Sequence, residues 1–248
     1  MKARCWLVTA AVLSLLPAAA RAQGLAGRFT IAAQIGTQSE VSGNMVQSTS
    51  GTLLDQPVRI DSLRYRDIYA PDWRLQGLLG FGVGERTEVI ARATWYKSTA
   101  VKGIEIGTLD DQQLFAYFPS QEEPFDYEEV GFEVGFRYYL ATQSRLKSYV
   151  APVVGVRFLN EALVSFSAPA AGSSIQNVPF SKETTVPVFG LDIGFTFDLG
   201  ERFYVGMDTG IRYQSPPGEF NYLPGLGAID GSDGRWSAPV VAVLGVRF

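Results

Sequence analysis

Charged side chains recur inside apolar segments of this chain, at every second position. Arginines and carboxylates alternate there with glycine, and bulky apolar residues occupy the positions between them. Because the planar guanidinium group of arginine bonds well to carboxylates, these residue types predict ion pairs between neighbouring strands. The candidates for this network are Glu88, Arg92, Glu133, Arg137, Asp192, Asp208 and Arg212.

Position along the predicted strands suggests which of these groups meet. Arg92 and Glu133 fall at similar depth on neighbouring strands, so we expect an ion pair between them. Asp192 and Asp208 also fall at comparable depth, and two such carboxylates need an arginine or a shared proton to avoid repulsion. The arginines available to them are Arg92, Arg137 and Arg212.

An alternation of apolar and polar residues predicts eight strands that carry these side chains. Each is long enough to cross a bilayer as a tilted strand, which favours an all-β fold, an eight-stranded antiparallel up-and-down transmembrane β-barrel. The expected strands are residues 28–38, 73–83, 87–98, 127–140, 148–159, 184–199, 202–214 and 235–248.

The connections between these segments alternate in length. Links of a few residues follow the second, fourth and sixth strands, whereas residues 39–72, 99–126, 160–183 and 215–235 form long connections rich in Ser, Gly and Pro. Short turns at one end and long loops at the other are typical of outer-membrane barrels. We expect the long segments to be loops without a second domain.

The N-terminus has the pattern of an export signal. A short basic start, an apolar run and Ala20-Arg21-Ala22 predict a signal peptide over residues 1–22 and one outer-membrane β-barrel domain over 23–248. The only cysteine, Cys5, lies in the signal, so the mature chain is expected to lack disulfides. It keeps 18 basic against 25 acidic side chains, a net charge of about −7 that disfavours nucleic acid.

Aromatic residues sort by strand end, all on the apolar face. We expect two belts at the two membrane interfaces, a feature that a soluble sandwich core would not produce. One belt is Trp73, Trp95 and Trp236; the other includes Phe29, Phe203 and Phe248, with Tyr138 and Phe197.

The composition argues against catalysis and cofactors. The chain contains no histidine, and its mature part contains no cysteine, so a Ser or Thr nucleophile would need a lysine or carboxylate as its base. Histidine and cysteine are also the usual transition-metal ligands. We therefore expect no enzyme, no metal site and no cofactor.

These features together resemble a known group of proteins. The signal, the eight strands and the terminal Gly245-Val246-Arg247-Phe248 are similar to the small outer-membrane barrels typified by the OmpA membrane domain, OmpX and OmpW. The resemblance implies location in a Gram-negative-type outer membrane, contact with its lipid and lipopolysaccharide, insertion by the barrel assembly machinery and a monomeric state. Nothing follows Phe248, so a peptidoglycan-binding domain is not expected.

Two functions remain open from the residues. In the first, charged side chains plug the lumen, and the protein has a structural or surface-interaction role, since eight strands leave an interior that side chains fill. In the second, which the resemblance to OmpW suggests, the barrel is a small channel or conduit for a minor solute, whether hydrophobic or polar. A steady conductance would separate the two.

Overall fold

The computed structural model describes residues 24–53, 55–71, 73–101, 103–118, 127–140, 144–217, 222–223, 227–228 and 233–248. The expected signal peptide lies outside these residues. Eight long strands form a closed antiparallel barrel in the order β1-β18-β15-β14-β11-β10-β7-β6. They are β1 (Phe29–Ser42), β6 (Trp73–Gly82), β7 (Thr87–Ser98), β10 (Tyr127–Tyr139), β11 (Leu146–Leu159), β14 (Thr184–Asp198), β15 (Phe203–Gln214) and β18 (Arg235–Arg247).

All eight predicted strands are confirmed, with ends that move by a few residues. The largest change is at β1, which continues to Ser42 because its last residues pair with the start of β18. Neighbours in the chain are neighbours in the barrel, and β1 closes it by pairing with both β6 and β18. Among the described residues, no helix has the length and apolar character needed to cross a membrane.

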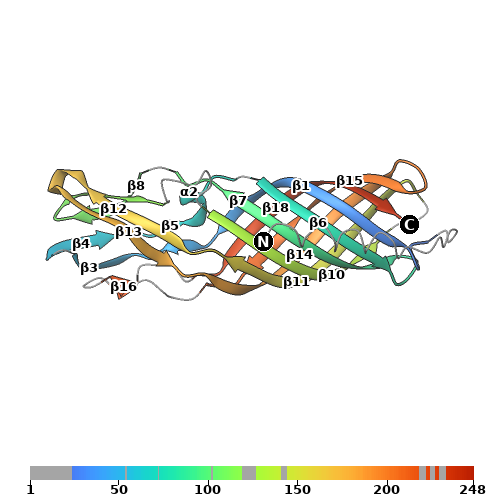
Figure 1. Ribbon diagram of the computed structural model, residues 1–248, viewed down its shortest axis with the longest axis horizontal. Coiled ribbons are helices and arrows are strands. Elements are labelled where there is room, and N and C mark those ends of the chain that lie inside the picture. Colours follow the sequence, from blue (N-terminus) through green and yellow to red (C-terminus); the bar gives the residue numbers. More distant parts are fainter. Residues whose placement is uncertain are drawn as a thin grey trace, which may run out of the picture.

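The barrel has a loop end and a turn end. At the turn end the links from β6 to β7 and from β14 to β15 are a few residues long, as predicted. Gly24 to Arg28 lie against this end, where Leu25 is buried and Gly27 N–H donates to the carbonyl of Gly82. Figure 1 shows the chain's C-terminus at the same end.

The expectation that the long segments are loops is wrong for three of the four. They fold into β-hairpins that form one six-stranded sheet, in the order β13-β12-β9-β8-β4-β3. The sheet strands are β3 (Thr49–Leu53), β4 (Gln56–Ile60), β8 (Ile104–Leu109), β9 (Gln112–Tyr117), β12 (Ala162–Ala168) and β13 (Ser173–Ser181). The smaller elements are β2 (Asn44–Val46), β5 (Leu63–Arg64), the one-turn helix α2 (Tyr65–Ile68), the 3₁₀ turn η1 (Pro169–Ala171), β16 (Tyr222–Leu223) and β17 (Gly227–Ala228).

Turn residues explain why hairpins form here. Asp110 and Asp111 link β8 to β9 and both have positive φ, the conformation of the two-residue turn that matches strand twist. Asp tolerates this left-handed region better than most residues. Between β12 and β13, Gly172 takes the left-handed position after a 3₁₀ turn that begins at Pro169. These turns fold each long segment back on itself.

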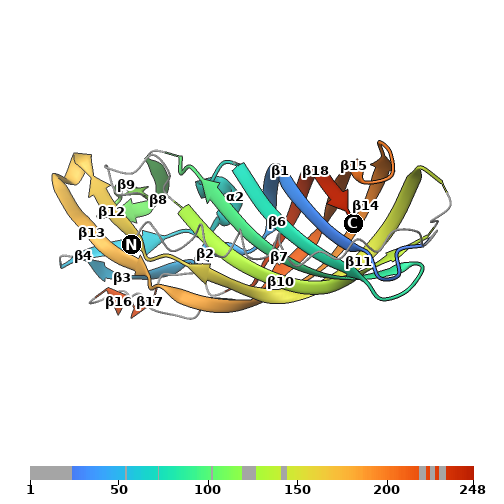
Figure 2. The same cartoon turned by 45° about the vertical axis from the view of Figure 1, so that its right-hand side comes forward.

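The six-stranded sheet continues the barrel wall. Four of its strands, β8, β9, β12 and β13, are next in the chain to a barrel strand, and only short elements separate β3 from β1 and β4 from β6. The two strand orders run in parallel around the molecule. Figures 1 and 2 show these strands gathered beyond one end of the barrel. We call this part, residues 44–71, 99–118 and 160–183, the extension. It stands above six of the eight barrel strands, and the described residues between β15 and β18 add no strand to it.

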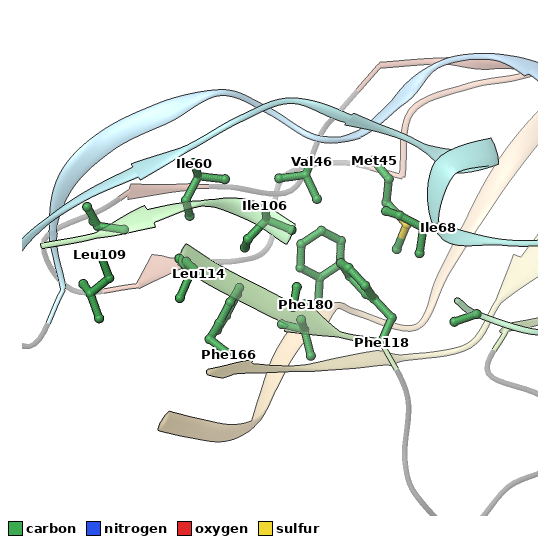
Figure 3. Packing of buried hydrophobic residues seen from close by; sticks show 14 of the residues in the cluster. Met45, Val46, Ile60, Ile68, Ile106, Leu109, Leu114, Phe118, Phe166 and Phe180 are labelled. Carbon is green, nitrogen blue, oxygen red and sulfur yellow. The ribbon is translucent and has the colours of Figure 1, made fainter. Parts of the chain in front are cut away.

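The extension has its own apolar core. Phe118 and Phe180 cross edge to face, with ring centroids 5.2 Å apart, and both are buried. In Figure 3 they lie beside Met45, Val46 and Ile68, which come from the first long connection. Burial of this cluster favours folding of the hairpins, because apolar surface leaves water. Its other members include Leu53, Val58, Ile60, Ile106, Leu109, Leu114, Val164 and Phe166.

Candidate functional site

Strand parity directs the charged side chains inward. On β10, for example, Glu129, Glu133 and Arg137 are buried, whereas Phe132 and Phe136 between them are about half exposed on the outside. The same alternation holds on the other barrel strands, because successive side chains point to opposite faces. The interior of the barrel is therefore polar and its outer surface apolar.

Inward-facing glycines make room for these long side chains. A Cβ atom built on Gly131 would lie 2.3 Å from Nη1 of Arg157, and one on Gly190 would lie 2.6 Å from Nη1 of Arg212. Gly245 likewise faces the ring of Tyr204. Any larger residue at these positions would collide with the group it faces. The glycines among the charges are thus part of the site.

Four arginines converge on the carboxylate of Glu133. Arg92 Nη1 lies 3.1 Å from Glu133 Oε2, Arg157 Nη2 lies 2.5 Å from Oε1, and Arg212 Nη2 lies 3.1 Å from Oε2. Arg74 Nη2 is farther, 3.8 Å from Oε1. Asp192 joins the group, because its oxygens lie 2.9 Å from Arg92 and 2.6 Å from Arg212. We call these six residues the Glu133 cluster.

The Glu133 cluster spans the width of the barrel. Its members come from β6, β7, β10, β11, β14 and β15, six of the eight strands. No member is more than 4% exposed, and Arg74 is 0% exposed. Charge-assisted hydrogen bonds in such a buried place are strong, and removal of one partner leaves the other charge uncompensated. The cluster therefore fixes the relative positions of strands on opposite sides.

A second group, the Asp208 cluster, lies nearer the turn end. Arg137 Nη2 is 3.4 Å from Asp208 Oδ2 and its Nη1 is 3.5 Å from Glu88 Oε2. Asp208 also accepts hydrogen bonds from Gln34 and from the hydroxyl of Tyr149. Arg137 lies over the Tyr149 ring, 4.7 Å from its centroid. A cation over an aromatic face adds to the stability of this buried group.

The seven residues expected to form one network thus fall into two groups. Arg92, Glu133, Asp192 and Arg212 belong to the Glu133 cluster, and Glu88, Arg137 and Asp208 belong to the Asp208 cluster. The two aspartates do not share a partner: Asp192 pairs with Arg92 and Arg212, and Asp208 with Arg137. Arg74 and Arg157 were missed as members, although their parity places them inside.

Aromatic rings and an arginine close the loop end of the interior. Arg235 lies 4.9 Å from the centroid of the Tyr65 ring and 5.2 Å from that of Tyr127. Its Nη2 is 2.5 Å from Glu129 Oε2, and its Nη1 is 3.8 Å from Glu40 Oε1. Tyr65 belongs to α2, which packs against the apolar core of the extension. Sequence reasoning missed this group because Tyr65 and Glu40 fall in an expected loop.

A corresponding group lies at the turn end. Arg247 Nη1 is 2.6 Å from Asp198 Oδ1, and its guanidinium carbon is 4.1 Å from the centroid of the Tyr204 ring. Lys147 Nζ is 2.5 Å from the other oxygen of Asp198. Leu25 joins the buried apolar residues of this region. Charged and apolar side chains are thus packed along the whole interior.

The expected belt residues lie on the outer surface. Trp73 and Trp236 are 56% and 43% exposed at the loop end, and Trp95 is half-buried there, where its ring N–H donates to Glu128. Phe29, Phe203 and Phe248 are exposed at the turn end. The large apolar residues between the two rings are also exposed, among them Leu79, Val89, Phe132, Val154, Leu191, Ile211, Val240 and Leu244.

Chemically, the interior is suited to holding strands together. Ion pairs, aromatic contacts and closely fitted glycines occupy it, and the described part of the chain contains no group of three or more Asp, Glu, His or Cys residues placed to hold a metal ion. The apolar outer face of the barrel would be unfavourable in water and is favourable in lipid. A closed barrel of eight antiparallel strands with this polarity defines the class: a small transmembrane β-barrel of the outer-membrane type.

Comparison with solved structures finds several proteins with some similarity to this chain. Neisserial surface protein A shares 15% identity with the chain, at 90% coverage of this chain, 99% of the other and a TM-score of 0.47. OprG from Pseudomonas aeruginosa shares 14% identity at 92% and 99% coverage and a TM-score of 0.44. Ail of Yersinia pestis shares 11% identity at 90% and 99% coverage and a TM-score of 0.40. No family model and no curated protein matches the sequence. The class therefore rests on the chain's own strands and surface.

Proposed function

We propose that the protein is a structural and surface-interaction barrel of a bacterial outer membrane, with an interior plugged by its own side chains. The extension would then stand outside the cell and present a folded β surface. Lipid and lipopolysaccharide would surround the apolar belt, and the barrel assembly machinery would insert the chain as a monomer. No catalytic step is part of this proposal, in keeping with a sequence that lacks histidine.

The observation that carries the proposal is the Glu133 cluster. Its side chains reach the middle of the barrel from six strands and are almost completely buried. An open water-filled pore of this width would leave such groups exposed to solvent. Ion pairs that are dry and reciprocally bonded instead support a filled cross-section, which is usual for eight strands.

The two ends support the same reading. Arg235 with Tyr65 and Tyr127 fills the loop end, and Leu25 with Tyr204 and Arg247 fills the turn end. A solute would have to displace three successive layers of packed side chains. This cost favours a scaffold over a conduit.

The surface of the extension supports an interaction role. Most of its large apolar residues point into the core, and side chains such as Arg59, Glu105 and Gln113 are exposed on the outside. A polar, hairpin-built wall is a rigid platform on which a partner could bind.

The direct test is conductance in a planar bilayer. We expect the purified protein to give no steady single-channel current, and the double variant Arg92→Ala/Glu133→Ala to give one, because it removes two members of the plug. A matched double variant in the extension, Arg59→Ala/Asp61→Ala, should stay silent, since that pair is exposed. Steady current through the unmodified protein, unchanged in the Arg92→Ala/Glu133→Ala variant, would support the small-channel function instead.

A further inference from the structure

The Glu133 cluster buries more positive than negative charge. Four arginines face two carboxylates, Glu133 and Asp192, so the group carries an excess of two positive charges. Arginine does not lose its proton in proteins, so this excess is permanent. Unbalanced charge in a dry interior is costly, and some negative group must offset it.

The neighbouring layers offset the excess only at a distance. Glu40 and Glu129 lie on the loop side and share Arg235. On the turn side, Glu88 and Asp208 share Arg137. Each layer has one carboxylate more than it has arginines. These carboxylates are bonded to partners of their own, and none of them forms an ion pair with an arginine of the Glu133 cluster.

Arg74 is the least compensated member. Its Nη1 donates to Gln38 Oε1, a neutral acceptor, and its Nη2 is 3.8 Å from Glu133, too far for a hydrogen bond. Among the described residues, Nε and Nη2 of Arg74 have no hydrogen-bond acceptor, and the same holds for Nε and Nη2 of Arg92. Both side chains reach the carboxylate of Glu133, from the neighbouring strands β6 and β7. These two side chains thus bury four N–H-bearing nitrogens for which the described part of the chain supplies no acceptor.

We propose that a small inorganic anion with the size and charge of chloride binds inside the barrel, at the unpaired donors of Arg74 and Arg92. A water molecule could accept hydrogen bonds from these donors but would leave the excess charge in place. An anion supplies both acceptors and charge, in the interior where electrostatic interactions are strongest. The inference rests on the Glu133 cluster and holds whether or not the barrel conducts.

Thermal unfolding of the folded protein in detergent tests the site. The unfolding midpoint would be followed on gels, by the loss of the band of the folded form as temperature rises. Sodium chloride would be replaced by sodium gluconate at constant ionic strength. We expect a saturable fall of about 2 to 4 °C on removal of chloride, because a ligand of the folded state stabilises it. Equal midpoints in the two salts would overturn the proposal.

The variant Arg74→Gln separates binding from a structural role. It removes one donor set and one of the mutually repelling charges. Its midpoint should therefore not depend on chloride, and in gluconate it should match or exceed that of the unmodified protein. The matched control is Arg247→Gln, another buried inward arginine, which pairs with Asp198. It should lower the midpoint and keep the chloride dependence. Equal chloride dependence in the two variants would contradict the site.

Bromide provides a readout that needs no variant. Crystals of the unmodified protein grown or soaked in bromide should show an anomalous peak within hydrogen-bond distance of the Arg74 guanidinium. The absence of a peak there would exclude the site even if Arg74→Gln did not fold. A bound ion would not by itself alter the conductance test, so the two proposals can fail independently.

Discussion

The barrel and the extension are built from continuous antiparallel strands, and they bury opposite side chains. In the barrel, Arg74 and Glu133 are inside and Phe132 is outside. In the extension, Phe166 is inside and Arg59 is outside. The reversal takes place along single runs of chain, where β11 leads into β12 and β13 into β14. Since strand geometry is common to both parts, the surrounding medium decides which face is apolar.

The largest effect should come from a charge inside the barrel. Arg92→Ala removes a partner of both Glu133 and Asp192 and should cost about 3 to 5 kcal/mol. The same change at Arg59, whose ion pair with Asp61 is exposed, should cost less than about 1 kcal/mol. Urea unfolding in lipid vesicles would measure both. Similar costs would mean that the two kinds of ion pair are equivalent.

A comparable but local effect is expected in the core of the extension. Phe166 is 2% exposed, and Phe166→Ala should destabilise this core by about 3 to 5 kcal/mol. We expect the extension to become sensitive to protease while the barrel still runs on gels as the folded form, because their interiors are separate clusters. Tyr117→Ala, at a partly exposed site, is the control. Loss of both parts together would show that they fold as one unit.

A smaller effect should follow from a charge on the outer face. Val240 is exposed on β18, and Val240→Arg should cost about 2 to 4 kcal/mol if lipid surrounds it. Gln113→Arg places the same side chain on the outer surface of β9 and should change stability by less than about 0.5 kcal/mol. Unfolding in vesicles compares them. A negligible cost at Val240 would place water, and not lipid, around the barrel.

The boundary between the two media can be located without loss of stability. Trp73, Trp95 and Trp236 lie where the barrel meets the extension. Their fluorescence should be quenched more by lipids labelled near the headgroup than by lipids labelled at the bilayer centre. Stronger quenching by lipids labelled at the bilayer centre would mean that the bilayer also surrounds part of the extension.

The barrel could be predicted in detail because its pattern is simple. A strand such as β10 alternates from Glu129 to Tyr138, so its parity fixes which residues face inward. Which inward residues pair could be predicted only for strands that are adjacent, as with Arg92 and Glu133. Arg92 with Asp192 joins positions 100 apart in sequence, on strands β7 and β14 that do not pair. Side-chain reach across the lumen decides such contacts.

The hairpins of the extension were not predictable by the same means. Their turns use Asp110-Asp111 or Pro169 to Gly172, which resemble ordinary loop composition. Their apolar residues are spread over three connections and become a core only when the connections meet. Segments such as β3, with the sequence Thr-Ser-Gly-Thr-Leu, carry almost no apolar signal alone. Cooperation between distant segments supplies the stability that each lacks.

The strands of the extension follow the same order around the molecule as the barrel strands below them, and this limits how the length of the extension strands can vary. Loops at the end of a barrel usually tolerate insertions, because they form no strand pairing that would fix their length. Here each hairpin is a template for the next, so a single added residue in β8 would turn its inner face outward and shift its pairing with β4. Changes of two residues, made in neighbouring hairpins together, would keep the faces in step. Related chains should therefore differ in the length of the extension strands by even numbers of residues.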